Sequence, residues 1–231
     1  MFRWNKLGRV FNPLDIKGKY WINEFAQAPN VLIFDNFIRV YFSCRPKPDE
    51  NGQYISYSAF VDLDRKELFN IVNFSKEPVL KLGDIGTFDE FGTYPISVVK
   101  NGADIYAYYA GHTRCESVPF NTAIGVAISK NNGETFNKVG DGPVLSYSPD
   151  EPFVLSGPKI KKIDEMWYLW YISGTKWIIH DGKPEVIYKI RMAYSKDGLN
   201  WTKINKNIIE VKEKWMELKS EYWMEYHKIR F

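Results

Sequence analysis

The sequence has few cysteines and no long apolar run. Cys44 and Cys115 are the two cysteines among 231 residues, and although they permit one disulfide, their positions do not require it. No segment approaches the roughly 18 consecutive apolar residues of a membrane-spanning helix. Residues 1–13 lack the apolar core and the small-residue cleavage site of a secretory signal. We therefore expect a soluble, cytoplasmic protein without a membrane span.

Charge of a single sign is also scarce. The net charge is +3, and the Lys and Arg residues are scattered along the chain, whereas proteins that bind nucleic acid normally cluster them on one face. No group of His, Cys or Asp residues has the spacing of metal ligands. We therefore expect no nucleic-acid partner, no metal and no cofactor.

The abundant residue types favour strands. Aromatic residues make up 16% of the sequence, and aromatic and β-branched residues are typical of sheets. Within residues 86–145, four short runs rich in them are separated by turn signals at Asn101-Gly102, at residues 115–121 and at Asn132-Gly133. This pattern predicts four consecutive antiparallel strands.

The same four-strand unit recurs along the chain. Pro29, Pro95 and Pro158 each open a short strand-like run, and they lie 66 and 63 residues apart. The segment AISKNNGETF at 127–136 recurs as AYSKDGLNW at 193–201, and its Asn-Gly or Asp-Gly pair suits a tight hairpin turn. Four strands repeated with a period near 65 residues predict the stacked blades of a β-propeller.

We therefore predict an all-β fold, a β-propeller of four-stranded antiparallel blades with a C-terminal helix. The blades are expected at about 27–80, 93–145 and 156–211, so that the propeller occupies residues 1–211, and helical spacing of apolar residues predicts an amphipathic helix over 212–231. Three blades leave bare sheet faces. We expect these faces to be covered by that helix or by a second copy, as a homodimer through the open blade faces, unless the chain is a fragment.

The repeated motifs resemble those of the five-bladed propeller glycoside hydrolases of families 43, 32, 62, 68 and 130. The resemblance covers residues 1 to about 210 and is greatest to a family-43-like group of bacterial surface-polysaccharide loci, through segments such as FDEFGTYPISVV and EPFVLSGP. It implies a five-bladed propeller that acts on a carbohydrate. Because five blades need on the order of 320 residues, the resemblance implies a C-terminally truncated, incomplete propeller.

The resemblance also implies three catalytic acids that this sequence lacks. Their places read Ala28-Pro29, Tyr94-Pro95 and Ser156-Gly157-Pro158, so Ala28, Tyr94 and Ser156 replace the acids. Glycosidases use two carboxylates about 5 to 9.5 Å apart, one protonated and one ionised. The usual hydrolytic residues therefore cannot be transferred to this chain, and two hypotheses remain.

In the first hypothesis, other carboxylates hydrolyse or phosphorolyse a glycosidic bond. The candidates lie a few residues ahead of the three prolines: Glu24, Asp89, Glu90 and Glu151.

In the second hypothesis, the propeller has no catalytic activity and binds a carbohydrate or a partner protein, or the protein is a truncated, inactive remnant. Polar and aromatic side chains would then hold the sugar, and the candidates are Gln27, Arg45, Tyr94, Arg114 and Trp177. His112 lies near Arg114 in the sequence and is expected to titrate near neutral pH.

Overall fold

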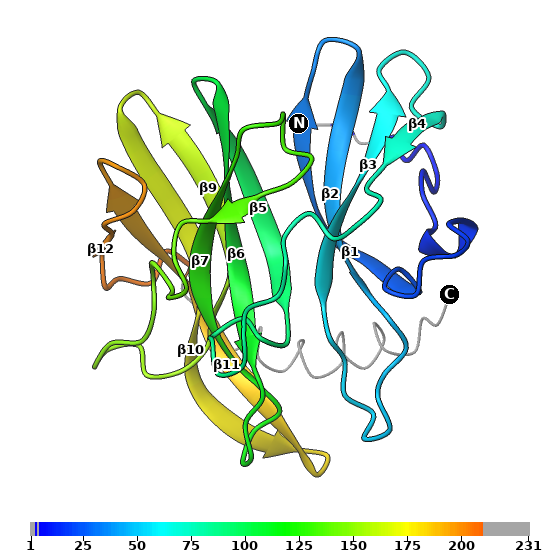
Figure 1. Ribbon diagram of the computed structural model, residues 1–231. Coiled ribbons are helices and arrows are strands. Elements are labelled where there is room, and N and C mark those ends of the chain that lie inside the picture. The colour runs from blue at the N-terminus through cyan, green and yellow to red at the C-terminus, as the bar shows by residue number, and fades with distance from the viewer. Residues whose placement is uncertain (1–2, 4, 210–231) are drawn as a thin grey trace.

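The computed structural model describes residue 3 and residues 5–209, and this part of the chain is nearly all-β. Blade 1 contains β1 (Glu24–Ile33), β2 (Phe37–Arg45), β3 (Tyr57–Asp64) and β4 (Ile71–Phe74); blade 2 contains β5 (Thr93–Asn101), β6 (Asp104–Thr113), β7 (Asn121–Ser129) and β8 (Asn137–Lys138); blade 3 contains β9 (Leu155–Ile163), β10 (Met166–His180), β11 (Lys183–Ser195) and β12 (Thr202–Lys203). In each blade, sequential strands are antiparallel neighbours (Figure 1). The prediction of four-stranded antiparallel sheets is confirmed.

Helix is almost absent from the described residues. They contain one 3₁₀ turn, Pro13–Asp15, and none of their helices is long and apolar enough to cross a membrane. The helix predicted over 212–231 lies outside the described residues.

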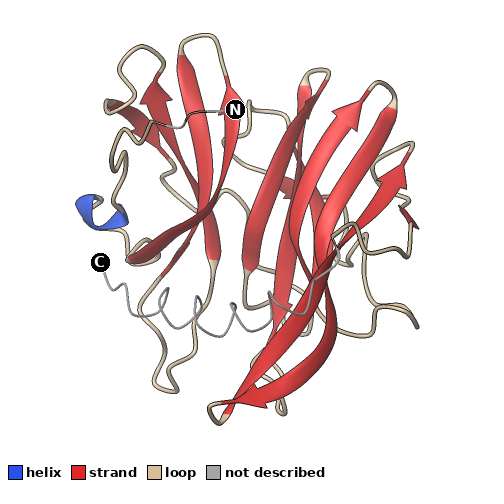
Figure 2. Cartoon of the chain, turned by 180° about the vertical axis from the view of Figure 1, so that it is seen from behind, coloured by secondary structure: helices blue, strands red, loops and turns tan. Residues whose placement is uncertain are grey.

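Figure 2 shows the strands of the three blades as neighbouring sheets. Apolar cores fill the space between neighbouring blades. Successive side chains of a strand point to opposite faces of its sheet, so neighbouring aromatic residues enter different cores. Tyr109 packs in the core between blades 1 and 2, whereas Tyr108 packs in the core between blades 2 and 3. A third core joins the N-terminal segment, through Trp21, to the other face of blade 1. The aromatic residues of the second strands thus hold the blades together.

Each inner strand carries one extra residue at the same place. On β1, Gln27 and Asn30 pair with Ser43 and Tyr41, so three steps on β1 match two steps on β2. The same mismatch occurs on β5 and on β9. The extra residues fall at 28–29, 94–95 and 157–158, which are the three proline sites of the sequence repeat. Bulges redirect side chains and are common beside active sites. We therefore expect the functional site at this end of the blades.

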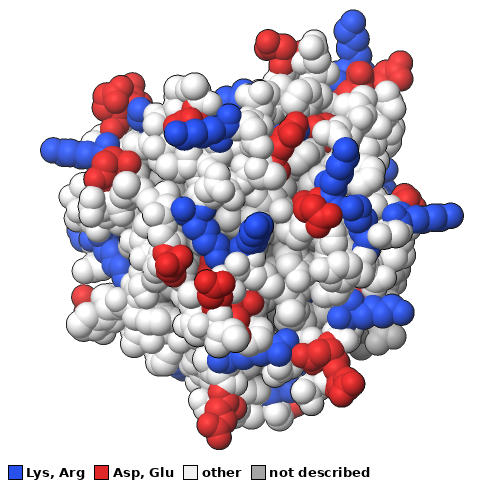
Figure 3. All heavy atoms as spheres, in the orientation of Figure 1, with Lys and Arg blue, Asp and Glu red and all other residues white. Residues whose placement is uncertain are grey.

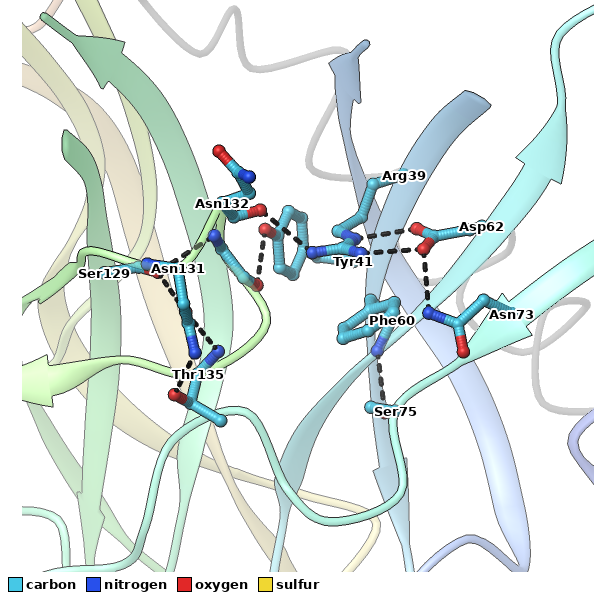
Figure 4. Close-up of polar contacts among 11 residues, drawn as sticks. Arg39, Tyr41, Phe60, Asp62, Asn73, Ser75, Ser129, Asn131, Asn132 and Thr135 are labelled. Atoms are coloured by element: carbon cyan, nitrogen blue, oxygen red, sulfur yellow. Dashed lines mark hydrogen bonds and ion pairs between the residues drawn. The ribbon is translucent and has the colours of Figure 1, made fainter. Parts of the chain in front are cut away.

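Arg39 forms a buried ion pair within blade 1 and also connects that blade to blade 2 (Figure 4). Arg39 donates hydrogen bonds to both carboxylate oxygens of Asp62, each at 2.7 Å, and both side chains are buried. Its Nη1 donates to the backbone carbonyl of Asn132, in the turn between β7 and β8, at 2.9 Å. The guanidinium carbon lies 3.7 Å from the centre of the Phe60 ring. One arginine therefore holds the outer turn of blade 2 against blade 1.

Two tyrosines repeat a hydrogen bond between blades. Tyr41 in blade 1 donates to the carbonyl of Gly133 in blade 2 at 2.8 Å, and Tyr108 in blade 2 donates to the carbonyl of Gly198 in blade 3 at 2.7 Å. Both glycines lie in the predicted tight turns and have positive φ angles, 79° and 76°, which glycine adopts without strain. Each blade thereby holds the turn of the blade that follows it.

We expect Tyr108→Phe to lower the free energy of unfolding by about 1 to 2 kcal/mol, because it leaves the buried carbonyl of Gly198 without its donor. Urea denaturation measures the change. Tyr194→Phe is the matched control, since that side chain is 38% exposed, and it should alter stability by less than about 0.5 kcal/mol. An unchanged midpoint for Tyr108→Phe would contradict the role of this hydrogen bond.

Candidate functional site

One end of the three blades collects several of the predicted site residues. The start of β1, the end of β2, the start of β5 and the end of β6 meet there, because antiparallel neighbours begin and end at the same edge. The long β10–β11 hairpin projects from this end, at the bottom of Figure 1. Side chains from all three blades therefore converge at this end.

Arg45, the last residue of β2, lies at the centre of the cluster. Its guanidinium carbon is 5.2 Å from the centre of the Phe25 ring, 5.1 Å from that of Tyr54 and 6.0 Å from that of Tyr94. Its Nε donates to Ser56 Oγ at 2.9 Å. The structure thus surrounds a half-buried guanidinium with aromatic rings from two blades.

Two further predicted residues join this cluster through tyrosine hydroxyls. Tyr54 donates a hydrogen bond to Glu24 Oε2 at 3.0 Å, and Tyr94 donates to Gln27 Oε1 at 3.2 Å. The structure therefore brings one catalytic candidate, Glu24, close to three candidates for sugar binding, Gln27, Arg45 and Tyr94. Tyr54 was not among the predicted site residues, because it lies in the loop after β2, outside every repeated motif.

A row of half-buried aromatic rings extends from this cluster towards blade 3. The rings of Tyr94 and His112 are nearly parallel, with centres 6.2 Å apart. His112 contacts Phe120 at 5.8 Å, and Phe120 contacts Trp177 on β10 at 5.7 Å, both between ring centres. Trp177 thereby contacts the site through Phe120. Phe120 lies in the loop before β7 and was not among the predicted site residues.

The imidazole of His112 is neutral at physiological pH. Burial, together with the positive charge of Arg45, lowers its pKa to about 4. The expectation that His112 titrates near neutral pH is therefore wrong, because sequence proximity does not reveal burial. In this site His112 supplies an uncharged ring surface.

The folded protein should lose stability as the pH falls from about 6.5 to about 4. Over this range the unfolded chain binds a proton at His112 and the folded chain does not, which weakens folding by about 2 kcal/mol, given 1.4 kcal/mol per pKa unit and partial screening. His112→Gln should lack this component in urea titrations at a series of pH values. His180→Gln, at an exposed hairpin tip, should retain it, and identical pH profiles for His112→Gln and wild type would refute the assignment.

The backbone of β1 is unusual at the site. Phe25 and Ala28 have positive φ angles of 66° and 48°, which are uncommon for residues with a side chain. β1 also carries a second irregularity, between Glu24 and Gln27. Such conformations cost free energy and concentrate at functional sites. Here they turn the start of β1 so that Glu24 and Gln27 reach the two tyrosines.

Asp89 is engaged inside blade 2. Its Oδ2 accepts a hydrogen bond from Tyr109 at 2.8 Å and lies 2.6 Å from Lys138 Nζ, while Oδ1 accepts from Thr87 at 3.1 Å. The carboxylate is buried. It joins the loop before β5 to the outer strand β8 of the same blade.

Glu151 repeats this arrangement in blade 3. Its carboxylate is fully buried, accepts a hydrogen bond from Tyr171 at 3.0 Å and lies 2.5 Å from Lys203 Nζ on β12. Arg191 Nη1 adds an ion pair at 3.3 Å. Burial raises the pKa of Glu151, but the hydrogen bond and charge of Lys203 outweigh this and hold the pKa below its ordinary value. The repeat of a carboxylate, a tyrosine and a lysine indicates a structural anchor in both blades.

The remaining two candidates make contacts beside the cluster. Glu90 Oε2 accepts a hydrogen bond from the backbone N–H of Gly86 at 2.9 Å, within the loop before β5. Arg114 forms an ion pair with Asp49 at 3.0 Å and lies over the Phe91 ring at 4.4 Å. Arg114 therefore has a carboxylate partner, which Arg45 lacks among the described residues.

Within the described residues, neither the cysteines nor a metal-ligand cluster adds to this site. Cys44 is buried, Cys115 is exposed, and both are free. No group of three or more His, Cys, Asp or Glu residues in this part of the chain is placed to hold a metal ion. On the face shown in Figure 3, basic and acidic side chains are interspersed.

Comparison with known proteins gives curated relatives of two kinds, uncharacterized mycobacterial proteins and a phosphorylase. No family model matches the chain. The uncharacterized protein Rv1502 of Mycobacterium tuberculosis is 34% identical over 204 residues, which cover 87% of this chain and 64% of that protein. The β-1,2-mannobiose phosphorylase of Thermoanaerobacter sp. (strain X514) is 25% identical over 146 residues, 58% of this chain and 45% of that protein. The chain thus spans less than two thirds of the length of these relatives.

Solved structures show the same fold at low identity. A glycoside hydrolase has a TM-score of 0.69 and 17% identity, with 93% of this chain and 65% of that chain covered. The GH32 β-fructofuranosidase BmSUC1 of Bombyx mori has a TM-score of 0.57 and 21% identity, with 81% and 36% covered. The likeness establishes that the three sheets are arranged as in the propeller-type fold of these proteins.

Proposed function

We propose that this protein binds a carbohydrate at the end of the blades where Arg45 lies. The observation that carries the proposal is the convergence of polar groups and aromatic rings from three blades on one surface. Glu24 and Gln27 offer acceptors, Arg45 offers donors, and the row from Tyr94 to Trp177 offers ring faces. A few placed polar groups among aromatic walls are typical of small-molecule sites.

The three-blade unit occupies residues 1–211 in this proposal, and the mannobiose phosphorylase and glycoside hydrolases among its relatives favour a sugar as the ligand. We place the protein in bacterial surface-polysaccharide metabolism, because its repeated motifs resemble those of proteins from such loci. A second copy packed on the open blade faces is part of the same proposal.

A second candidate function is cleavage of the bound glycosidic bond. It is favoured by Glu24, the candidate carboxylate that lies within the cluster and accepts from Tyr54. Glu24 would donate a proton to the leaving sugar oxygen while water or phosphate attacks the anomeric carbon, so that the glycosidic C–O bond breaks as the new C–O bond forms. The proton that the attacking water or phosphate loses passes to solvent, and Glu24 takes up a proton from solvent before the next cycle. Asp89 and Glu151 are less suited to this step, because each is buried against a lysine.

A glycan microarray followed by calorimetric titration of its hits tests the binding proposal. We expect Tyr94→Ala to weaken binding at least about tenfold, since it removes a ring and a hydroxyl that positions Gln27. Tyr194→Ala, at the opposite end of blade 3, is the matched aromatic control and should bind as wild type does. Absence of binding across the array would refute the proposal.

Incubation of the hits with and without phosphate tests the second candidate. Glu24→Gln should abolish sugar release and leave binding within a few-fold of wild type. Turnover that survives in Glu24→Gln would exclude this residue as the proton donor.

A further inference from the structure

We propose that the ligand carries an acidic group, a carboxylate or a phosphate, and that Arg45 is the residue that recognises it. This inference rests on the proposed carbohydrate function and adds the chemical class of the ligand. It would make Arg45 the residue that determines specificity at this site.

Arg45 carries a positive charge that no carboxylate in the described part of the chain neutralises. None of the ion pairs among the described residues includes it, and its one hydrogen bond runs from Nε to Ser56. The other two arginines that reach into this region or between blades are neutralised, since Arg114 pairs with Asp49 and Arg39 with Asp62. Arg45 is therefore a half-buried cation whose terminal nitrogens are left for a partner.

The surroundings of Arg45 favour an acidic ligand as the partner of its guanidinium. Three aromatic rings and the neutral imidazole of His112 form its neighbourhood, and burial is the main cause that lowers its pKa. A desolvated guanidinium binds a planar carboxylate or a phosphate with two parallel hydrogen bonds, and the pairing is strong where water is excluded. A neutral sugar would leave this charge uncompensated.

Glu24 does not supply the missing anion. It faces Arg45 across the β1–β2 pair, but its carboxylate is not within ion-pairing distance, and its Oε2 accepts from Tyr54 instead. Glu24 raises the pKa of Arg45 only as a distant charge. The Glu24 carboxylate is thus engaged by Tyr54, and it leaves Arg45 without an ion-pair partner among the described residues.

The acidic group has two sources, a substituent of the glycan or free phosphate that enters as a second reactant. Matched pairs separate them: oligogalacturonate and its carboxyl-reduced product, and a phosphorylated mannan oligosaccharide and its phosphatase-treated product. Inorganic phosphate is added as a competitor and is also titrated alone. Each probe is measured against wild type, Arg45→Gln, Arg45→Lys and the exposed control Arg9→Gln.

With wild type and Arg9→Gln, we expect the acidic member of at least one pair to bind about tenfold or more tightly than its neutral product. Arg45→Gln should remove this preference, and Arg45→Lys should keep part of it because the charge remains without the planar fork. Direct binding of inorganic phosphate that is lost in Arg45→Gln would support the same recognition with phosphate as the source.

Equal binding of acidic and neutral members by wild type, with no binding of phosphate, would overturn the inference and leave the carbohydrate proposal intact. Preference for acidic members that persists in both Arg45 variants, with unchanged melting temperatures, would also overturn it. Absence of binding by every glycan and by phosphate would refute both proposals.

Discussion

The Arg39→Met variant should lose about 3 to 5 kcal/mol of the free energy of unfolding. Arg39 and Asp62 form a buried pair with two 2.7 Å hydrogen bonds, and removal of the guanidinium leaves the Asp62 carboxylate buried with Asn73 as its remaining donor. The variant also loses the hydrogen bond that holds the β7–β8 turn through Asn132. Urea denaturation followed by tryptophan fluorescence measures the loss.

Two further variants separate the ion pair from general effects of the substitution. Arg65→Met changes an exposed arginine and should cost less than about 0.5 kcal/mol. The double variant Arg39→Met/Asp62→Leu should recover most of the loss, because an apolar pair of similar volume can replace a buried ion pair. A loss below about 1 kcal/mol in Arg39→Met would show that the pair does not connect the blades energetically.

The Glu151→Ala variant should lose about 3 kcal/mol or more, because it leaves Lys203 and the Tyr171 hydroxyl without their buried partner. A pH titration of stability gives a second readout. The pKa of Glu151 in the folded state is below its ordinary value of 4.5, so its contribution is complete above that pH and is lost as the pH falls further. Glu151→Ala should lack this acid-dependent part.

Glu24→Ala is the contrasting carboxylate variant. Glu24 has one tyrosine as its hydrogen-bond partner and lies at the start of β1, so its removal should change stability by less than about 1 kcal/mol. It should instead impair the site. If Glu151→Ala were as stable as wild type and lost ligand binding, the assignment of Glu151 as a structural anchor would be wrong.

The repeat was readable from the sequence because it depends on local chemistry. Proline-led strands and Asn-Gly or Asp-Gly turns are signals within a few residues, and the three sheets confirm them. The equivalence of Ala28, Tyr94 and Ser156 was predicted from the same prolines, and the structure adds that a bulge lies at or directly after each of them.

The sequence did not show which candidate acids lie in the site and which are buried against a lysine. That difference depends on partners far along the chain. Asp89 and Glu151 precede their prolines as Glu24 does, yet each is held by a lysine about 50 residues later, Lys138 or Lys203. Only the pairing of the third strand with the fourth brings these lysines within reach. Burial of His112 is likewise a property of packed blades and has no local signal.

Hydrogen–deuterium exchange with and without a glycan hit tests the central claim most directly, which is that the ligand binds where Arg45 lies. We predict that the ligand protects segments 23–27, 45–56 and 92–94, with weaker protection of 112–120. A separate hollow of about 390 Å³ lies between the inner strands and is lined by Val98, Ile160 and Lys161 among others. The ligand should not change the exchange rates of the backbone amides that line it. Protection confined to that hollow or to the outer strands β4, β8 and β12 would contradict the account.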